Sequence, residues 1–113
     1  MTSHTDLKIM EHVENFCKRI GGGLLLDLGC GPTFRHTKIA LKYGFNVCAM
    51  DVVKPRIVEK RIKFIEFDIN KDVPRFRNKF DVVICTEIIE HIENPHKLFR
   101  DVHKMLKKGG FFS

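Results

Sequence analysis

The sequence predicts an α/β fold, a doubly wound and mostly parallel sheet with helices on both faces. Two observations support this prediction. Short apolar runs of strand length alternate with longer segments whose apolar residues recur every three or four positions, which is typical of parallel sheets. Glycines or acidic residues follow the apolar runs, where connections to the next element are expected.

The first 44 residues of the chain carry two predicted helices and one predicted strand. Apolar residues at helical spacing predict a helix over residues 5–20, which the glycines at 21–23 end. The run 24–28 is short and apolar on both faces, so it predicts a buried strand. After a glycine-rich turn, a second helix is predicted from about residue 33 to 43, with Gly44 as its left-handed cap.

The rest of the chain, from residue 45 on, carries three further predicted strands and one predicted helix, and the start of a fifth strand. Apolar runs predict strands over residues 46–51 and 80–86, and the alternating run 63–68 predicts a strand nearer the sheet edge. Helical spacing predicts a helix over residues 95–107, followed by lysine and glycine residues that suit a helix C-terminus. A fifth strand would begin at residues 111–112.

Composition restricts the class of protein. Of 113 residues, 43% are hydrophobic and 30% are charged, which is typical of a globular domain. The four cysteines show no Cys-x-x-Cys pair or zinc-type spacing, so a disulfide scaffold and a zinc ribbon are disfavoured. No apolar run approaches the ~20 residues of a membrane span, and the N-terminus lacks a signal-peptide pattern. We therefore expect a cytoplasmic protein without a membrane partner.

Acidic residues mark the carboxyl ends of the predicted strands. Asp27 precedes Gly29 and Gly31 at the end of the first strand, while Asp51 and Asp68 end the second and third. In an open parallel sheet a ligand binds beyond these ends. Glycines let the backbone approach a ligand closely, and an acid about twenty residues farther on can bind ribose hydroxyls. The sequence therefore predicts a nucleotide-type cofactor.

Two classes of cofactor use this geometry. A dinucleotide site requires a third glycine, but the bulky Phe34 occupies that position. The carboxylate of Asp27 would repel a diphosphate and attract a cationic amino-acid group. The string Asp-Leu-Gly-Cys-Gly-Pro over residues 27–32 resembles the cofactor-site signature of the class I S-adenosylmethionine-dependent methyltransferases. The resemblance extends over residues 24–112 and implies a Rossmann-like methyltransferase fold.

The resemblance implies S-adenosylmethionine as the cofactor. Gly29, Cys30 and Gly31 would lie against its methionyl end, and Asp27 would help to hold its ammonium group. Cys30 stands in an apolar setting, which favours a small packing residue over a nucleophile.

The other implied contacts come from the ends of the next three strands. Asp51 would bind both ribose hydroxyls, with Val52 against the adenine ring. Asp68 would accept a hydrogen bond from the adenine amino group, and Ile69 would flank the ring. Thr86 would supply backbone contacts near the methionyl group. No catalytic residue is identified, because methyl transfer requires mainly the alignment of the two reactants.

A metal site is an alternative at the end of the fourth strand. Glu87, Glu90 and His91 would lie on neighbouring faces of one helical turn and could bind a divalent ion. This string also resembles small-RNA 3′-terminal 2′-O-methyltransferases and some quinone-pathway O-methyltransferases, in which these residues hold a magnesium-type ion. Metal-free members carry a similar string with structural hydrogen bonds, and we favour that interpretation.

The methyl acceptor is only partly restricted. After the fourth strand there is no Asn/Asp-Pro-Pro-Tyr/Phe string and no Pro-Cys, which disfavours DNA-base amino methylation and the cytosine C5 mechanism. Lysines and arginines crowd residues 54–63 and 71–79, where they could bind the phosphates of RNA, although such loops are more often solvated. A small-molecule acceptor is therefore favoured, with RNA as the alternative.

We expect a single S-adenosylmethionine-binding domain over residues 1–113, with an N-terminal helix at 5–20 and a cofactor-binding core at 24–113. A complete fold of the resembled family has seven strands, whereas this chain ends as the fifth begins, so the fold would be incomplete at the C-terminus and the fourth strand nearly an edge. The chain would be a truncated enzyme, or a half-enzyme or non-catalytic cofactor-binding subunit whose sheet a second copy or a partner subunit completes.

Overall fold

The computed structural model describes residues 4–31, 33–55, 59–71, 75–85 and 93–112. Within these ranges the chain forms three helices and five strands. In chain order they are α1 (His4–Ile20), β1 (Gly23–Leu28), α2 (Arg35–Lys42), β2 (Phe45–Asp51), β3 (Ile62–Glu66), β4 (Phe80–Ile84), α3 (Pro95–Met105) and β5 (Leu106–Phe112). None of the described helices is long and apolar enough to span a membrane.

The five strands form one sheet in the order β3-β2-β1-β4-β5, and all neighbouring strands are parallel. The chain winds outward from β1 through β2 to β3 and then crosses back to β4 and β5. This reversal between β1 and β4 is the switch point at which open α/β sheets bind ligands. The doubly wound parallel fold predicted from the sequence is confirmed, and so is the edge position of β3.

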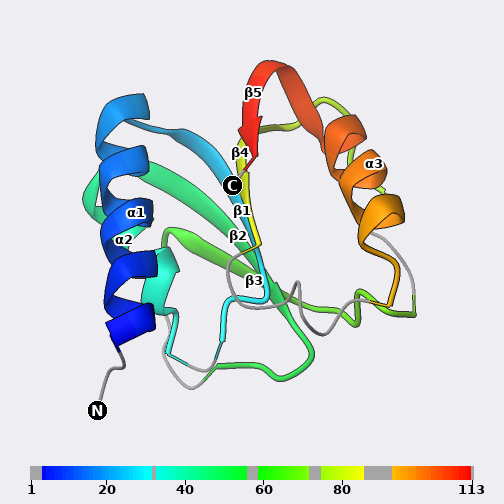
Figure 1. Ribbon diagram of the computed structural model, residues 1–113, viewed down its shortest axis with the longest axis horizontal. Coiled ribbons are helices and arrows are strands. Elements are labelled where there is room, and N and C mark those ends of the chain that lie inside the picture. The colour runs from blue at the N-terminus through cyan, green and yellow to red at the C-terminus, as the bar shows by residue number, and fades with distance from the viewer. Residues whose placement is uncertain (1–3, 32, 56–58, 72–74, 86–92, 113) are drawn as a thin grey trace.

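Helices cover both faces of this sheet. Figure 1 shows α1 and α2 on one side and α3 on the other. Because successive strand residues point to opposite faces, Leu25 of β1 joins the core beneath α1 and α2, while Leu26 and Leu28 join the core beneath α3. Asp27 shares a face with Leu25, so its side chain lies on the α2 side of the sheet.

The C-terminal part differs from the prediction. The helix expected over residues 95–107 ends at Met105, and β5 begins at Leu106, well before residues 111–112. Phe80 pairs with Leu106, and the register then shifts before the next pairs form, so residues 107–110 are accommodated as an irregularity of the strand. With β5 paired along it, β4 is an interior strand, and the expectation that it lies nearly at an edge was wrong.

Other boundaries moved by a few residues. α2 begins at Arg35 rather than residue 33, because Phe34 before it has a left-handed backbone with φ of 53°. β3 and β4 end at Glu66 and Ile84, two residues earlier than predicted. Gly44 has a φ of 89°, as expected for the cap of α2.

A carboxylate joins three strands at the amino end of the sheet. Asp81 of β4 accepts a hydrogen bond from the Leu24 amide of β1 at 2.8 Å, and its other oxygen lies 3.7 Å from the Lys107 ammonium of β5. Gly23 lies so close that a Cβ there would come within 2.6 Å of the Asp81 carboxylate. Asp81 therefore serves the assembly of the sheet.

Candidate cofactor-binding site

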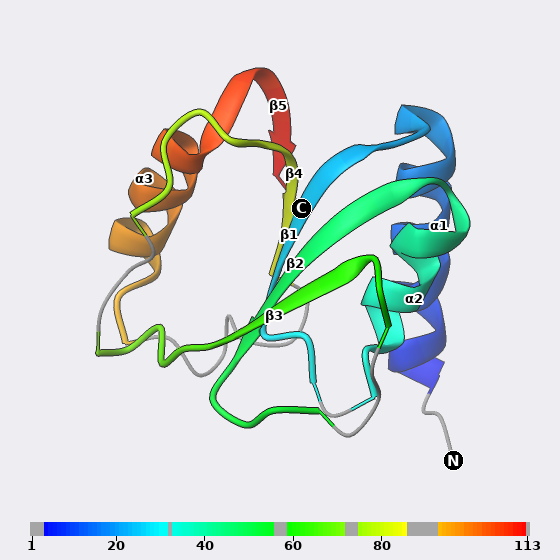
Figure 2. The ribbon, with the colours of Figure 1, turned by 180° about the vertical axis from the view of Figure 1, so that it is seen from behind.

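The glycine loop after β1 is fixed against the end of β2. The amides of Gly29 and Cys30 both donate to the Met50 carbonyl, at 2.8 and 3.2 Å. The Gly31 amide donates to the Asp51 carboxylate at 2.8 Å. Positive φ angles of 80° at Gly29 and 76° at Gly31 allow this tight path. Figure 2 shows the loops after β1 and β2 at the same end of the sheet.

These bonds affect which ligand the loop can hold. A phosphate is normally bound by free backbone amides at such a turn. Here three successive amides already donate within the chain. These amides are therefore not free for a phosphate, which disfavours a diphosphate at this loop.

Asp51 is held in place through both of its carboxylate oxygens. One oxygen accepts from Gly31 and the other accepts from the Val52 amide at 2.7 Å. A carboxylate oxygen can accept more than one hydrogen bond, so each keeps capacity for a hydroxyl donor. The side chain of Val52 beside it is 52% exposed, and that of Val53 is 69% exposed. The end of β2 thus presents a fixed acid next to an apolar surface.

Asp27 lies beneath the glycine loop rather than at its surface. Its side chain is fully buried and accepts a hydrogen bond of 2.5 Å from the Thr37 hydroxyl of α2. Burial raises the pKa of the Cys85 thiol to about 12 and of the Cys17 thiol to about 11, and the charge of Asp27 adds to both shifts. Asp27 is therefore enclosed between β1 and α2.

Thr37 was not singled out from the sequence. The available signal was its position on the buried face of α2, where it is the hydroxyl beside the apolar Ala40 and Leu41. The bond to Asp27 anchors α2 to β1 directly under the predicted site. Sequence periodicity identifies the buried face of a helix, but not the partner that a polar residue meets there.

Asp68 lies in the turn after β3. Its carboxylate accepts from the Asn70 amide at 3.0 Å, and its carbonyl accepts from the Lys71 amide at 3.1 Å. The Phe67 amide donates to the Asp51 carbonyl at 2.9 Å, which holds the end of β3 beside the end of β2. Ile69 is half-buried and packs against the core beneath α3.

Direct backbone bonds thus join the glycine loop, the end of β2 and the end of β3. Thr86 lies outside the described residues, as do the alternative metal ligands Glu87, Glu90 and His91. Among the residues that are described, no three His, Cys, Asp or Glu side chains form a group that could hold a metal ion.

Phe34 occupies the position of the third glycine in a dinucleotide pattern. Its ring is buried and packs edge-on against Phe64 of β3, with ring centroids 6.4 Å apart. The Lys38 amide donates to the Phe34 carbonyl at 2.9 Å, which begins the hydrogen bonding of α2. In a dinucleotide-binding fold, a glycine at this position lets the helix pack closely against the strand. Here the Phe34 ring occupies that space.

Comparisons with known proteins point to one family. A family model described as a methyltransferase domain matches residues 26–113. The ubiquinone biosynthesis O-methyltransferase of Azotobacter vinelandii is 31% identical over 116 aligned residues, which cover 93% of this chain and 47% of that protein. The enzyme of the same name from Rickettsia bellii is 30% identical, over 90% of this chain and 45% of its own length. The chain spans about half the length of these curated relatives.

Solved structures agree with this. An S-adenosylmethionine-dependent methyltransferase from Mesorhizobium loti has a TM-score of 0.75 and 26% identity, covering 90% of this chain and 51% of that chain. A 1,6-didemethyltoxoflavin N1-methyltransferase from Burkholderia thailandensis, solved with S-adenosylhomocysteine, has a TM-score of 0.75 and 22% identity, covering 95% of this chain and 52% of that one. At 22% identity the second likeness concerns the fold alone.

Proposed function

The chain belongs to the class I S-adenosylmethionine-dependent methyltransferases, and on that premise we propose that it binds S-adenosylmethionine at the carboxyl ends of β1, β2 and β3 and serves methyl transfer to a small molecule. One observation carries the proposal. The Asp51 carboxylate and the Gly31 amide form a direct hydrogen bond, which holds the acid and the glycine loop together and supports a single cofactor site there.

The chemistry of the site fits this cofactor. Asp51 offers two positioned oxygens for a pair of ribose hydroxyls, and the exposed Val52 offers an apolar surface for adenine. Asp68, in the adjoining turn, would accept from the adenine amino group, with Ile69 beside the ring. The amides of the glycine loop are already bonded within the chain, which disfavours a phosphate, and an ionised Asp27 nearby would favour a positively charged ligand.

Catalysis would consist mainly of alignment. When bound, S-adenosylmethionine supplies a methyl group on a positively charged sulfur, which an incoming nucleophile takes while the sulfur keeps the bonding electron pair. The residues of this chain hold and orient that group: Asp51 from the ribose side and the glycine loop from the methionyl side. Orientation of two reactants can contribute about 7–11 kcal/mol to such a step.

The acceptor we propose is an oxygen atom of a small molecule. The curated relatives are named as O-methyltransferases of ubiquinone biosynthesis, which favours a small acceptor over RNA. Acceptors with phenol-type hydroxyls are the first to test, because a phenol is readily deprotonated for attack on carbon. A short RNA with a free 3′ end is the comparison substrate.

The first experiment is a calorimetric titration of the purified chain with S-adenosylhomocysteine, with NAD as the control. We expect saturable one-to-one binding of S-adenosylhomocysteine and no binding of NAD. A folded chain that binds NAD, or that binds neither ligand, would contradict the cofactor assignment.

The role of Asp51 is tested by Asp51→Asn. This substitution keeps one oxygen, which can accept from the Gly31 amide, loses the acceptor of the Val52 amide, and removes the charge proposed to hold the ribose hydroxyls. We expect affinity for S-adenosylhomocysteine to fall by about 1.5–3 kcal/mol, the range for hydrogen bonds to a charged group. Glu66→Gln is the matched control, because Glu66 is an exposed acid at the end of the neighbouring strand β3. Equal affinities in the two variants would remove Asp51 from the site.

Turnover separates an enzyme from a cofactor-binding subunit. Methyl transfer from labelled S-adenosylmethionine to a phenolic acceptor by the chain alone would support the proposed activity. Binding of S-adenosylhomocysteine with turnover only after another polypeptide is added would favour the non-catalytic subunit instead. Turnover with RNA and none with phenols would contradict the small-molecule acceptor.

A further inference from the structure

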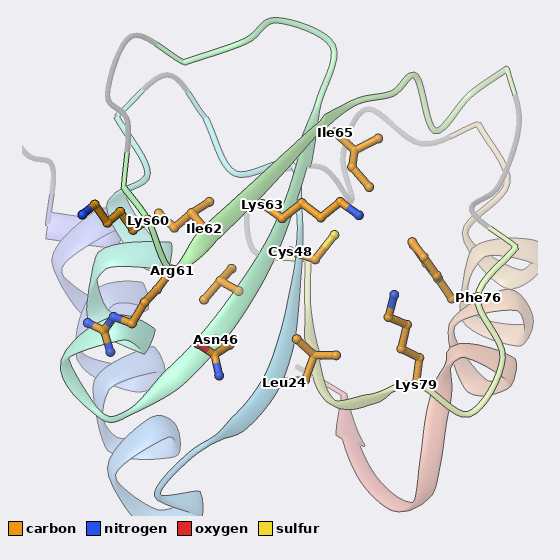
Figure 3. A pocket seen from close by; sticks show the side chains of 11 residues that line it. Leu24, Asn46, Cys48, Lys60, Arg61, Ile62, Lys63, Ile65, Phe76 and Lys79 are labelled. Carbon is orange, nitrogen blue, oxygen red and sulfur yellow. The ribbon is translucent and has the colours of Figure 1, made fainter.

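Two basic segments far apart in the sequence meet at a groove away from the candidate cofactor site. The groove has a volume of about 280 Å³ and lies over the amino-terminal halves of β1 and β2 and along β3 (Figure 3). Its apolar lining includes Leu24, Cys48, Ile65 and Phe76, which belong to or pack against the core on the α3 side. Its cations are Lys60, Arg61, Lys63 and Lys79.

Only two of these four cations face the interior of the groove. Figure 3 shows the ammonium groups of Lys63, on β3, and Lys79, just before β4, approaching the region of Cys48 from different sides. Lys60 and Arg61 point away from it. Burial raises the pKa of the Cys48 thiol, and the charges of Lys79 and Lys63 oppose that rise, consistent with both ammonium groups lying near the same sulfur.

The position of Lys79 is set by the fold. Its amide donates to the Met105 carbonyl at 2.8 Å, which holds the segment before β4 against the end of α3. Its ammonium lies 4.6 Å from the centre of the Phe76 ring, so a cation and an aromatic face stand side by side. Within the described part of the chain, neither Lys63 nor Lys79 forms an ion pair with a carboxylate.

We propose that this groove binds a small organic anion with an apolar body. Two converging ammonium groups repel each other when no described carboxylate pairs with either of them, and one anionic group placed between them would relieve that repulsion. The apolar part of the ligand would lie on Ile65 and Phe76. The volume is close to the lower end of small-molecule pockets, at roughly 300 Å³.

The groove is a second site, beyond the proposed methyl transfer. On β1 and β2 its lining comes from the first half of each strand, at Leu24 and residues 46–48, while the candidate cofactor residues Asp27 and Asp51 lie at the carboxyl ends of these strands. Along β2, Cys48 and Asp51 are about 10 Å apart at the usual rise of a strand. A ligand in the groove and a cofactor beyond the strand ends can therefore bind at the same time.

The test uses 8-anilinonaphthalene-1-sulfonate, a fluorescent anion with an aromatic body, titrated into the whole chain. We expect saturable one-to-one binding that is weakened about tenfold or more in the double variant Lys63→Gln, Lys79→Gln, since two charge-assisted contacts are lost. The control is the double variant Lys60→Gln, Arg61→Gln, which loses the same charge from side chains that point away. Equal weakening in both variants would overturn the proposal, because it would show only a general effect of charge.

Competition against the bound probe tests the native chain and does not depend on any variant folding. We expect 2-naphthoate to displace the probe, while inorganic phosphate and S-adenosylhomocysteine at the same concentration leave it bound. Displacement by phosphate would show that the apolar body contributes nothing and would overturn the proposal. Displacement by S-adenosylhomocysteine would place the probe in the cofactor site and would also overturn it, without affecting the proposed function.

Discussion

The two ends of the parallel sheet use carboxylates in different ways. At the amino end, Asp81 joins strands to one another, through the Leu24 amide and the Lys107 ammonium. At the carboxyl end, backbone amides hold Asp51 in place and leave it capacity for further hydrogen bonds. The same residue type thus serves assembly at one end of the sheet and, as we propose, ligand binding at the other.

The amino end should therefore be the more sensitive to changes that affect stability. Gly23→Ala should lower the free energy of unfolding by roughly 2–5 kcal/mol, because its Cβ would meet the Asp81 carboxylate and its φ of 124° disfavours a side chain. Gly21→Ala is the control: its φ of 81° is also unfavourable, but no atom lies within 4 Å. It should cost about 1–2 kcal/mol. Urea unfolding measures both, and equal losses would show that the Asp81 contact is unimportant.

At the carboxyl end, the buried Asp27 depends on Thr37. Thr37→Val should lower the free energy of unfolding by about 1–3 kcal/mol, because it removes a hydrogen bond from a buried carboxylate while keeping the side-chain shape. Thr37→Ser, which keeps the hydroxyl, should lose less. If denaturant unfolding finds the valine variant as stable as the serine variant, Asp27 does not need this donor.

A third contact, near the start of β2, should depend on pH. Glu14 of α1 accepts hydrogen bonds from the Tyr43 hydroxyl at 2.7 Å and the Lys42 ammonium at 3.1 Å. The Tyr43 bond, followed by Lys42, lowers the pKa of Glu14 from its ordinary 4.5. A lowered folded pKa stabilises the fold above the unfolded value, and this contribution is lost as pH falls through the folded value.

Wild-type protein should therefore be slightly more stable than Glu14→Gln at pH 7, and the difference should shrink below about pH 4.5. Thermal unfolding at several pH values measures this difference. A difference that stays constant down to pH 3 would mean that the ionisation of Glu14 does not contribute.

The smallest expected effect is a difference in rate between two thiols. Cys85 follows β4 at the carboxyl end, and burial raises its pKa to about 12. Cys48 lies in the groove, where Lys79 and Lys63 oppose the effect of burial on its pKa. Iodoacetamide at pH 8 should therefore alkylate Cys48 before Cys85 in the native chain, as followed by peptide mass spectrometry. Faster reaction of Cys85 would contradict this order.

The sequence by itself determined the α/β class, the edge position of β3 and the positions of most elements. These features depend on local periodicity and on glycines at element ends, such as Gly44, whose φ of 89° matches its predicted role. The family resemblance, carried by residues 27–32, also came from local sequence, and the match over residues 26–113 confirms it. The individual cofactor contacts stay predictions.

Only the tertiary structure decided how distant residues meet. The bonds of Gly31 to Asp51 and of Thr37 to Asp27, and the approach of Lys63 and Lys79, depend on which strands lie side by side. The early start of β5 has the same origin, because Leu106 pairs with Phe80 of β4 directly after α3 ends. Periodicity reports which face of an element is buried, whereas strand order and packing select the partner, so the sequence located the strand ends and the fold decided what was joined there.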